Sequence, residues 1–186
     1  MYIKKNNLVI RSAELRDAEK LNAWWNDGAV MAHAGFPNGL GQPLEETEAE
    51  IKAYEGKLSQ LCVLEIEGVP VGEASFGLIG EGVAEIGIKI CNFAYQNQGY
   101  GSELLRMLIT YLFEDSELNE KYPVDKIILD TSLKNVRAQR VYEKLGFEKV
   151  RVNIGSWRDQ LGELQDSVDY ELSREMYEVQ DWSECE

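Results

Sequence analysis

Alternating apolar and polar residues predict several strands in the middle of the chain. In residues 83–90 every second residue from Ala84 to Ile90 is apolar, which is typical of a strand with one buried face. Two further strands are predicted at 61–66 and 69–79, because short Gly-containing segments typical of hairpin turns follow each of them. Shorter runs predict additional strands at 8–10, 124–130, 150–154 and 168–172.

Apolar residues spaced three or four positions apart predict the helices. The clearest stripe follows Gly101 and consists of Leu104, Leu105, Leu108, Ile109 and Leu112. Other helices are expected around Leu15 to Trp25, at 47–54, and from Asn135 to a terminating Gly146. Residues 35–43 are too rich in Gly and Pro for regular structure and predict a loop.

The order of these elements indicates the fold class. It reads β-α-α-β-β-β-α-β-α-β-β, which predicts a layered α/β domain with a central, mainly antiparallel sheet. We expect about seven strands and about four helices. The 186 residues contain no repeat or long linker, so a single domain over 1–186 is expected.

Composition narrows the environment and the partners. The net charge of −14 disfavours nucleic acid and anionic membranes, and it either favours cationic partners or simply maintains solubility. No apolar run is long enough to span a bilayer, and three cysteines without Cys-x-x-Cys spacing are typical of reduced thiols in the cytoplasm. With one histidine, His33, no clustered-His metal site is expected; we interpret His33 as structural or substrate-side.

One segment is a candidate for anion binding. The sequence Gln96-Asn97-Gln98-Gly99-Tyr100-Gly101 lies between a predicted strand and a predicted helix. Such a turn directs free backbone N–H groups outward at the positive end of the helix, and glycine lets an anion approach closely. A plain helix-entry turn is the alternative interpretation. The dinucleotide and nucleoside-triphosphate glycine patterns do not fit, since Leu104 replaces the third glycine of the first and the second lacks its Lys-Ser/Thr.

Two motifs together resemble a known superfamily. Gln96-x-x-Gly99-x-Gly101 resembles the Gln/Arg-x-x-Gly-x-Gly/Ala motif of the GNAT acyl-CoA-dependent N-acetyltransferases. The later segment Asn135-x-x-Ala138-x-x-x-Tyr142 with Gly146-Phe147 resembles the second motif of that superfamily. The resemblance covers essentially the whole chain and implies the GNAT fold. It also implies acetyl-CoA as co-substrate, with no metal.

The resemblance also implies which residues contact the cofactor. The predicted cofactor-binding set is Ile90, Cys91, Asn97, Gln98, Gly99, Tyr100, Gly101, Ser102 and Asn135. Within it, the turn amides would hold the pyrophosphate, Asn135 the pantetheine arm, and a backbone N–H near Ile90 the thioester oxygen. Residues 134–151 carry six basic and two acidic side chains, which either suits a phosphorylated cofactor or is only a solvated helix face.

Three residues are candidates for catalysis. Glu85 lies fourteen residues before Gly99, the spacing of a catalytic glutamate in related histone acetyltransferases, although it could be structural. Asp130 is the rival base, and it could instead cap the following helix. Glu73 is a third, weaker carboxylate candidate. By resemblance, Tyr142 would supply a proton to the leaving thiolate, and a plain core tyrosine is the alternative.

The acceptor is less well defined by the sequence. The segment Trp24-Trp25-Asn26-Asp27 with Gly35-Phe36-Pro37 resembles the branch that contains ribosomal-protein-alanine acetyltransferases, and aminoglycoside acetyltransferases share parts of it. The expected reaction is direct attack by a primary amine, from a small molecule or a protein N-terminus, in a ternary complex. A non-catalytic CoA-binding module and a homodimer are both left open. The first two helices and residues 35–43 and 156–166 are expected to select the acceptor.

Overall fold

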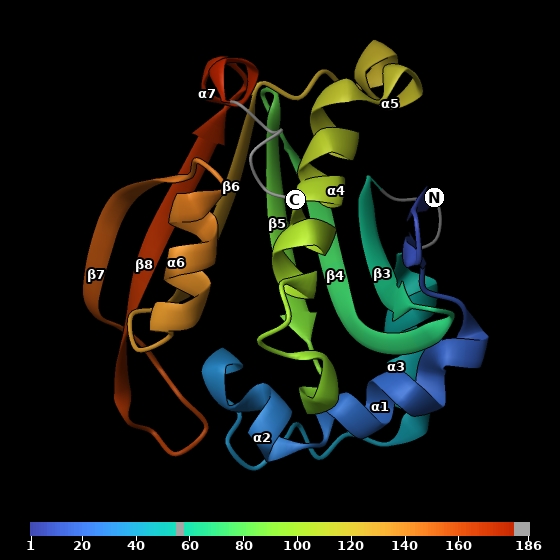
Figure 1. Cartoon of the computed structure of the whole chain (residues 1–186). Coiled ribbons are helices and arrows are strands. Elements are labelled where there is room, and N and C mark those ends of the chain that lie inside the picture. Colours follow the sequence, from blue (N-terminus) through green and yellow to red (C-terminus); the bar gives the residue numbers. More distant parts are fainter. Residues whose placement is uncertain (55–57, 181–186) are drawn as a thin grey trace.

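A twisted eight-stranded sheet runs through the part of the chain that the structure describes, residues 1–54 and 58–180 of a computed structural model (Figure 1). Its order is β1-β2-β3-β4-β5-β6-β8-β7, and every pairing is antiparallel except that of β5 with β6. The strands are β1 (Tyr2–Lys5), β2 (Leu8–Ser12), β3 (Ser59–Ile66), β4 (Val69–Gly80), β5 (Val83–Ile90), β6 (Lys126–Ser132), β7 (Glu148–Arg158) and β8 (Leu164–Ser173).

Helices cover both faces of this sheet. They are α1 (Ala18–Trp25), α2 (Gly28–Met31), α3 (Leu44–Ala53), α4 (Tyr100–Glu114), α5 (Ser116–Lys121), α6 (Val136–Lys144) and α7 (Arg174–Val179). Short 3₁₀ turns lie at η1 (Leu15–Asp17), η2 (Ala32–Ala34) and η3 (Phe93–Tyr95). In Figure 1, α4 and α6 lie side by side across the sheet, whereas α1 and α2 lie at its lower edge.

Two apolar clusters hold these layers together. The larger cluster packs α4 and α6 on the sheet through fully buried residues such as Leu105, Leu108 and Ile127. The smaller one joins α1, α2 and α3 to the other face and is centred on Leu21, Trp24 and Trp25.

The parallel pair in the middle of the sheet separates soon after it begins. Pairing of β5 with β6 starts at Val83 with Lys126 and ends at Glu85 with Ile128. Beyond that point β5 continues to pair with β4 as far as Ile90, while β6 continues with β8 as far as Ser132. The two strands therefore diverge and leave a gap in the sheet that opens toward α4 and α6.

The predicted fold class is confirmed, with several differences in detail. Strand β1 was not predicted, because its sequence Tyr-Ile-Lys-Lys shows too short an alternation and it pairs only at the sheet edge. The last two strands are longer than predicted and reduce the expected 157–166 connection to a tight turn. Cys62 and Cys91 are buried free thiols, whereas Cys185 lies outside the described residues.

Candidate active site

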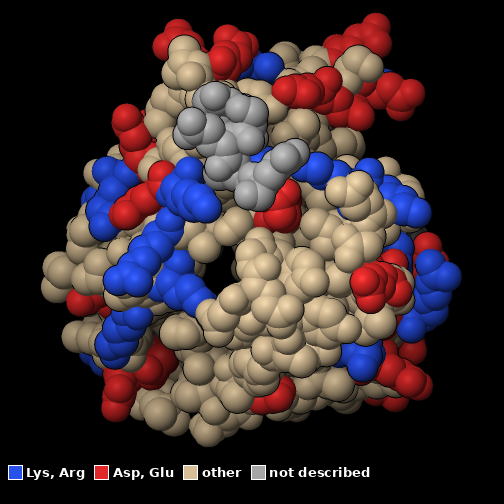
Figure 2. Space-filling model, viewed as in Figure 1, with Lys and Arg blue, Asp and Glu red and all other residues tan. Residues whose placement is uncertain are grey.

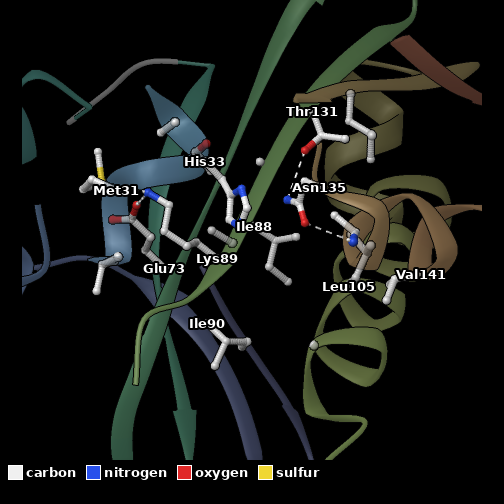
Figure 3. A pocket seen from close by; sticks show the side chains of 18 of the residues that line it. Met31, His33, Glu73, Ile88, Lys89, Ile90, Leu105, Thr131, Asn135 and Val141 are labelled. Carbon is white, nitrogen blue, oxygen red and sulfur yellow. Dashed lines mark hydrogen bonds and ion pairs between the residues drawn. The ribbon is translucent and has the colours of Figure 1, made fainter. Parts of the chain in front are cut away.

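A large cavity lies at the divergence of β5 and β6. Its volume is about 980 Å³, and it runs from the start of α4 and α6 to the residues of α1, α2 and η2. Figure 2 shows a hollow at this place beside a stripe of Lys and Arg side chains, and Figure 3 shows the residues around it.

No described helix is both long and apolar enough to cross a membrane.

The turn before α4 forms one end of this cavity. Asn97 and Gly99 have positive φ angles of 60° and 84°, which reverse the chain and direct the first turn of α4 at the cavity. The backbone N–H groups of Gly99, Tyr100 and Gly101 make no hydrogen bond with any described residue. A Cβ on Gly99 would meet no atom within 4 Å, so the space in front of these amides is open. The arrangement is suited to an anion.

Polar side chains fix the shape of this turn. The Gln96 side-chain amide donates to the carbonyl of Ile90 at 2.7 Å, and Arg137 of α6 donates to the Gln96 Oε1 at 2.8 Å. Arg137 also lies 3.5 Å from the Asn97 Oδ1. Exposed basic residues lie along α6 and at its start, namely Lys134, Arg137, Arg140 and Lys144, and Arg137 lines the cavity. Positive charge thus lies next to the free amides.

The structure divides the predicted cofactor-binding set. Ile90, Asn97, Gly99, Gly101, Ser102 and Asn135 line the cavity. Cys91, Gln98 and Tyr100 do not line it. Burial raises the pKa of the Cys91 thiol to about 12, the Gln98 amide donates to the carbonyl of Ala94, and Tyr100 packs near Tyr95. The side chains of these last residues therefore support the turn from behind.

Asn135 and Tyr142 both reach the cavity from the second motif. Asn135 caps α6: its Oδ1 accepts from the Ala138 N–H at 3.3 Å, and its Nδ2 donates to the Thr131 Oγ1 at 3.2 Å (Figure 3). Tyr142 is only 7% exposed and packs against Tyr170 and Phe147. Burial, and then the charge of Asp130, raise the pKa of Tyr142 to about 12. No described residue hydrogen-bonds its hydroxyl, so it is free to donate into the cavity.

The three candidate carboxylates have different surroundings. Asp130 lines the cavity, and burial together with the charge of Asp169 raises its pKa. Glu73 also lines it, but its oxygens accept from the Trp25 Nε1 at 2.5 Å and from the Lys89 Nζ at 3.0 Å. Glu85 and Asp130 are both exposed, but Glu85 is absent from the cavity lining, because it lies where β5 still pairs with β6. Tertiary structure thus brings Asp130 and Tyr142 together and leaves Glu85 apart.

The opposite end of the cavity is lined by residues from segments that the sequence analysis assigned to the acceptor. Trp25, Met31, His33 and Trp157 line this end, and the His33 imidazole points into the cavity from η2 (Figure 3). Glu73 and Lys89 are cross-strand partners in the β4–β5 register, and Lys89 also contacts the Met31 sulfur at 3.1 Å. Opposite charges favour such facing positions on adjacent strands.

Comparison with known proteins identifies the family. The family model described as "Acetyltransferase (GNAT) domain" matches residues 7–148, which span both motifs and the diverging strands. The chain belongs to the GNAT acetyltransferase family. Its acetyltransferase class is therefore shown independently of any single residue.

Individual relatives are more distant. The chain is 28% identical to the uncharacterized N-acetyltransferase YnaD of Bacillus subtilis, covering 80% of this chain and 84% of that protein. It is also 28% identical to an aminoglycoside N(6′)-acetyltransferase type 1 of Klebsiella pneumoniae, over 77% and 75%.

A solved structure confirms the fold. A ribosomal L7/L12 alpha-N-protein acetyltransferase in complex with coenzyme A has a TM-score of 0.80 at 16% identity, with 93% of this chain and 98% of that one covered. At this level of identity the likeness shows the shared fold alone. The expected likeness to ribosomal-protein acetyltransferases is thus confirmed for the fold, and the acceptor is a separate question.

Proposed function

We propose that this GNAT protein transfers an acetyl group from acetyl-CoA to the primary amine of a small cationic molecule. The observation that carries the proposal is the continuous cavity from the free amides at Gly99–Gly101, through the gap between β5 and β6, to the wall around Trp25 and His33. One end suits phosphate, the middle is lined by the edges of β5 and β6, and the other end is acidic and aromatic. A phosphorylated donor and a cationic acceptor can therefore enter from opposite ends and meet in the middle.

The cofactor side fits coenzyme A. The free N–H groups of Gly99 to Gly101 would hold the pyrophosphate, and Arg137 would supply positive charge beside it. Cys91 donates its N–H to the Val71 carbonyl, so by antiparallel alternation the N–H groups of Ile88 and Ile90 point away from β4. They face the gap left by β6, where they would bond the pantetheine arm and the thioester oxygen.

We assign the general base to Asp130. Acetyl-CoA supplies a reactive thioester, and the acceptor ammonium must lose a proton before its nitrogen can attack the carbonyl carbon. Asp130 lies in the cavity with a raised pKa, which makes it a better proton acceptor than an ordinary aspartate. Glu85, the candidate favoured by spacing, is exposed outside the cavity lining.

Tyr142 would complete the transfer. As the new C–N bond forms and the C–S bond breaks, the sulfur leaves as a thiolate that needs a proton or a hydrogen bond. The buried Tyr142 hydroxyl, with a pKa of about 12, is protonated at neutral pH and has no other partner among the described residues. It can therefore donate to the sulfur. Asp130 would release the ammonium proton to solvent before the attack, and the second proton, lost from nitrogen as the amide forms, would replace the one that Tyr142 gives to the sulfur, so that protons and charges balance.

The acceptor end favours a cation. Glu50, Glu73 and Asp130 all line the cavity, and Lys89 neutralises only Glu73. Trp25 and Trp157 also line the cavity. Carboxylates and aromatic faces both attract ammonium groups, so a small amine with more than one positive charge is the acceptor class that this chemistry supports.

The test has two stages. Calorimetry should detect acetyl-CoA binding, and release of free thiol should then be measured with spermidine, kanamycin and a short peptide with a free N-terminus. We expect thiol release to be fastest with one of the two polycations. Binding of acetyl-CoA without thiol release for any amine would favour the non-catalytic module instead, and a preference for the peptide would contradict the small-cation acceptor.

A further inference from the structure

Two segments that are distant in sequence are joined beside the acceptor end of the cavity. One is the loop 35–39 after η2, and the other is the turn 159–163 at the tip of the β7–β8 hairpin. Gln160 makes the connection with three hydrogen bonds, which we call the Gln160 latch. Its N–H donates to the Gly35 carbonyl at 2.8 Å, its Oε1 accepts from the Asn38 N–H at 2.9 Å, and its Nε2 donates to the Gly39 carbonyl at 2.8 Å.

The latch acts on residues that line the cavity. Gly35 ends η2, the turn that carries His33, and it adopts a φ of 91° that favours glycine. Trp157 packs directly on Gly35, since a Cβ at that position would lie 2.3 Å from the indole ring. His33 and Trp157 both line the cavity, whereas Gln160 does not. Gln160 therefore holds the wall in place from outside.

The hairpin tip is built as a firm support for this contact. Asp159 accepts from the N–H groups of Leu161 and Glu163 at 2.9 and 3.0 Å, and its second oxygen accepts from the Gln165 side chain at 2.6 Å. These bonds close the turn without help from the loop 35–39. An exposed glutamine whose donor and acceptor groups all engage one remote loop therefore reinforces the contact that Trp157 makes with Gly35.

We propose that Gln160 is a positioning residue for the acceptor amine, a role that rests on the proposed function. By fixing η2 against Trp157, the latch sets the width of the acceptor end and keeps the amine close to the thioester. Without the latch the wall relaxes, and small amines are held less tightly. The cofactor end is unaffected, because it is built by α4, α6 and the turn before α4.

The experiment compares three variants of the intact chain, with acetyl-CoA and spermidine or kanamycin. Gln160→Ala removes both side-chain bonds and should raise the amine KM about tenfold, with kcat within about twofold of wild type. The acetyl-CoA Kd should not change. Arg158→Ala is the matched control: among the described residues Arg158 hydrogen-bonds only the Gly162 carbonyl, within the same hairpin, so this variant should keep the wild-type KM.

Hydrogen exchange reports on the Gln160 latch without an activity measurement. The Asn38 amide should exchange faster in Gln160→Ala, whereas Gln160→Glu should keep it protected, because a carboxylate still accepts that N–H. Faster Asn38 exchange with an unchanged amine KM would overturn the proposal, as would an equal rise in KM for Arg158→Ala. A wild-type protein that binds no acetyl-CoA would instead overturn the proposed function, so the two failures are distinguishable.

Discussion

The cofactor-side and acceptor-side halves of the cavity are built in different ways. The cofactor side consists of two strand-turn-helix units, each a continuous stretch of sequence with its own glycines and caps. The acceptor side is assembled from α1, η2, β4, β5 and the hairpin tip, which meet through contacts such as Gln160 with Asn38, 122 residues apart. The cofactor side is thus encoded by local sequence, whereas the acceptor side is assembled from segments that are distant in the sequence.

Removing the carboxylate of Asp130 should have the largest effect, because it lies where the two halves meet. We expect Asp130→Asn to lower kcat/KM about 10³-fold, the upper range for loss of a general base. Glu85→Gln is the matched control and should stay near wild type. The raised pKa adds a pH signature: the base works when ionised, so activity should fall on the acid side at a pH above that of an ordinary aspartate. A large loss in Glu85→Gln alone would return the role to Glu85.

Tyr142→Phe tests the cofactor half at the reacting sulfur. The ring and its packing against Tyr170 remain, so the fold and the acetyl-CoA Kd should be preserved. Loss of the hydroxyl should lower kcat about 10²-fold with little change in KM, because the bond strengthens as thiolate charge develops. Single-turnover kinetics would check this in a regime limited by chemistry. Equal rates for the variant and wild type would make Tyr142 a core residue only.

We expect the stability of the acceptor half to depend on a buried ion pair. Arg11 donates to both Asp17 oxygens at 2.7 Å and to Glu65 at 2.8 Å, anchoring the start of α1 to β2. Breaking this pair with Asp17→Asn should lower the free energy of unfolding by about 3 kcal/mol, measured by urea denaturation.

The same pair makes stability depend on pH. Burial opposes ionisation of Asp17, but the hydrogen bonds from Arg11 and the Glu14 N–H, and the charges of Arg11 and Arg16, together outweigh it and lower its pKa. A carboxyl group whose pKa is lower in the folded than in the unfolded protein stabilises the fold at pH values above its unfolded pKa. This contribution of Asp17 should therefore be lost as the pH falls below about 4. If wild type and Asp17→Asn lose stability in parallel from pH 6 to about 3, the pair does not supply this pH dependence.

The smallest effect is expected for a substitution at Gly101. It tests whether this glycine is needed for the backbone conformation or for contact with acetyl-CoA. A Cβ there would lie 3.6 Å from Ile90, an ordinary contact, and the backbone is helical. Gly101→Val should therefore fold but weaken acetyl-CoA binding about tenfold by crowding the pyrophosphate. Gly99 is a poorer probe, since its φ of 84° would strain any other residue. If Gly101→Val binds acetyl-CoA with unchanged affinity by calorimetry, the pyrophosphate binds elsewhere.

The sequence by itself determined the order of elements, the turn before α4 and the second motif. These features are local: strand alternation, helical stripes and glycine at positive φ, as at Gly99 and Gly146, depend on neighbouring residues. The short edge strand β1 was missed, because its four residues carry little pattern and depend on pairing with β2.

Only the tertiary structure decided which side chains share the cavity. Glu85 had the expected spacing, but β5 and β6 diverge one residue later, so Asp130 faces the cavity and Glu85 does not. The Trp25 contact with Glu73 and the Gln160 latch likewise join segments whose separation no local pattern can encode. Such contacts follow from strand register and layer packing, which arise only when the whole chain is folded.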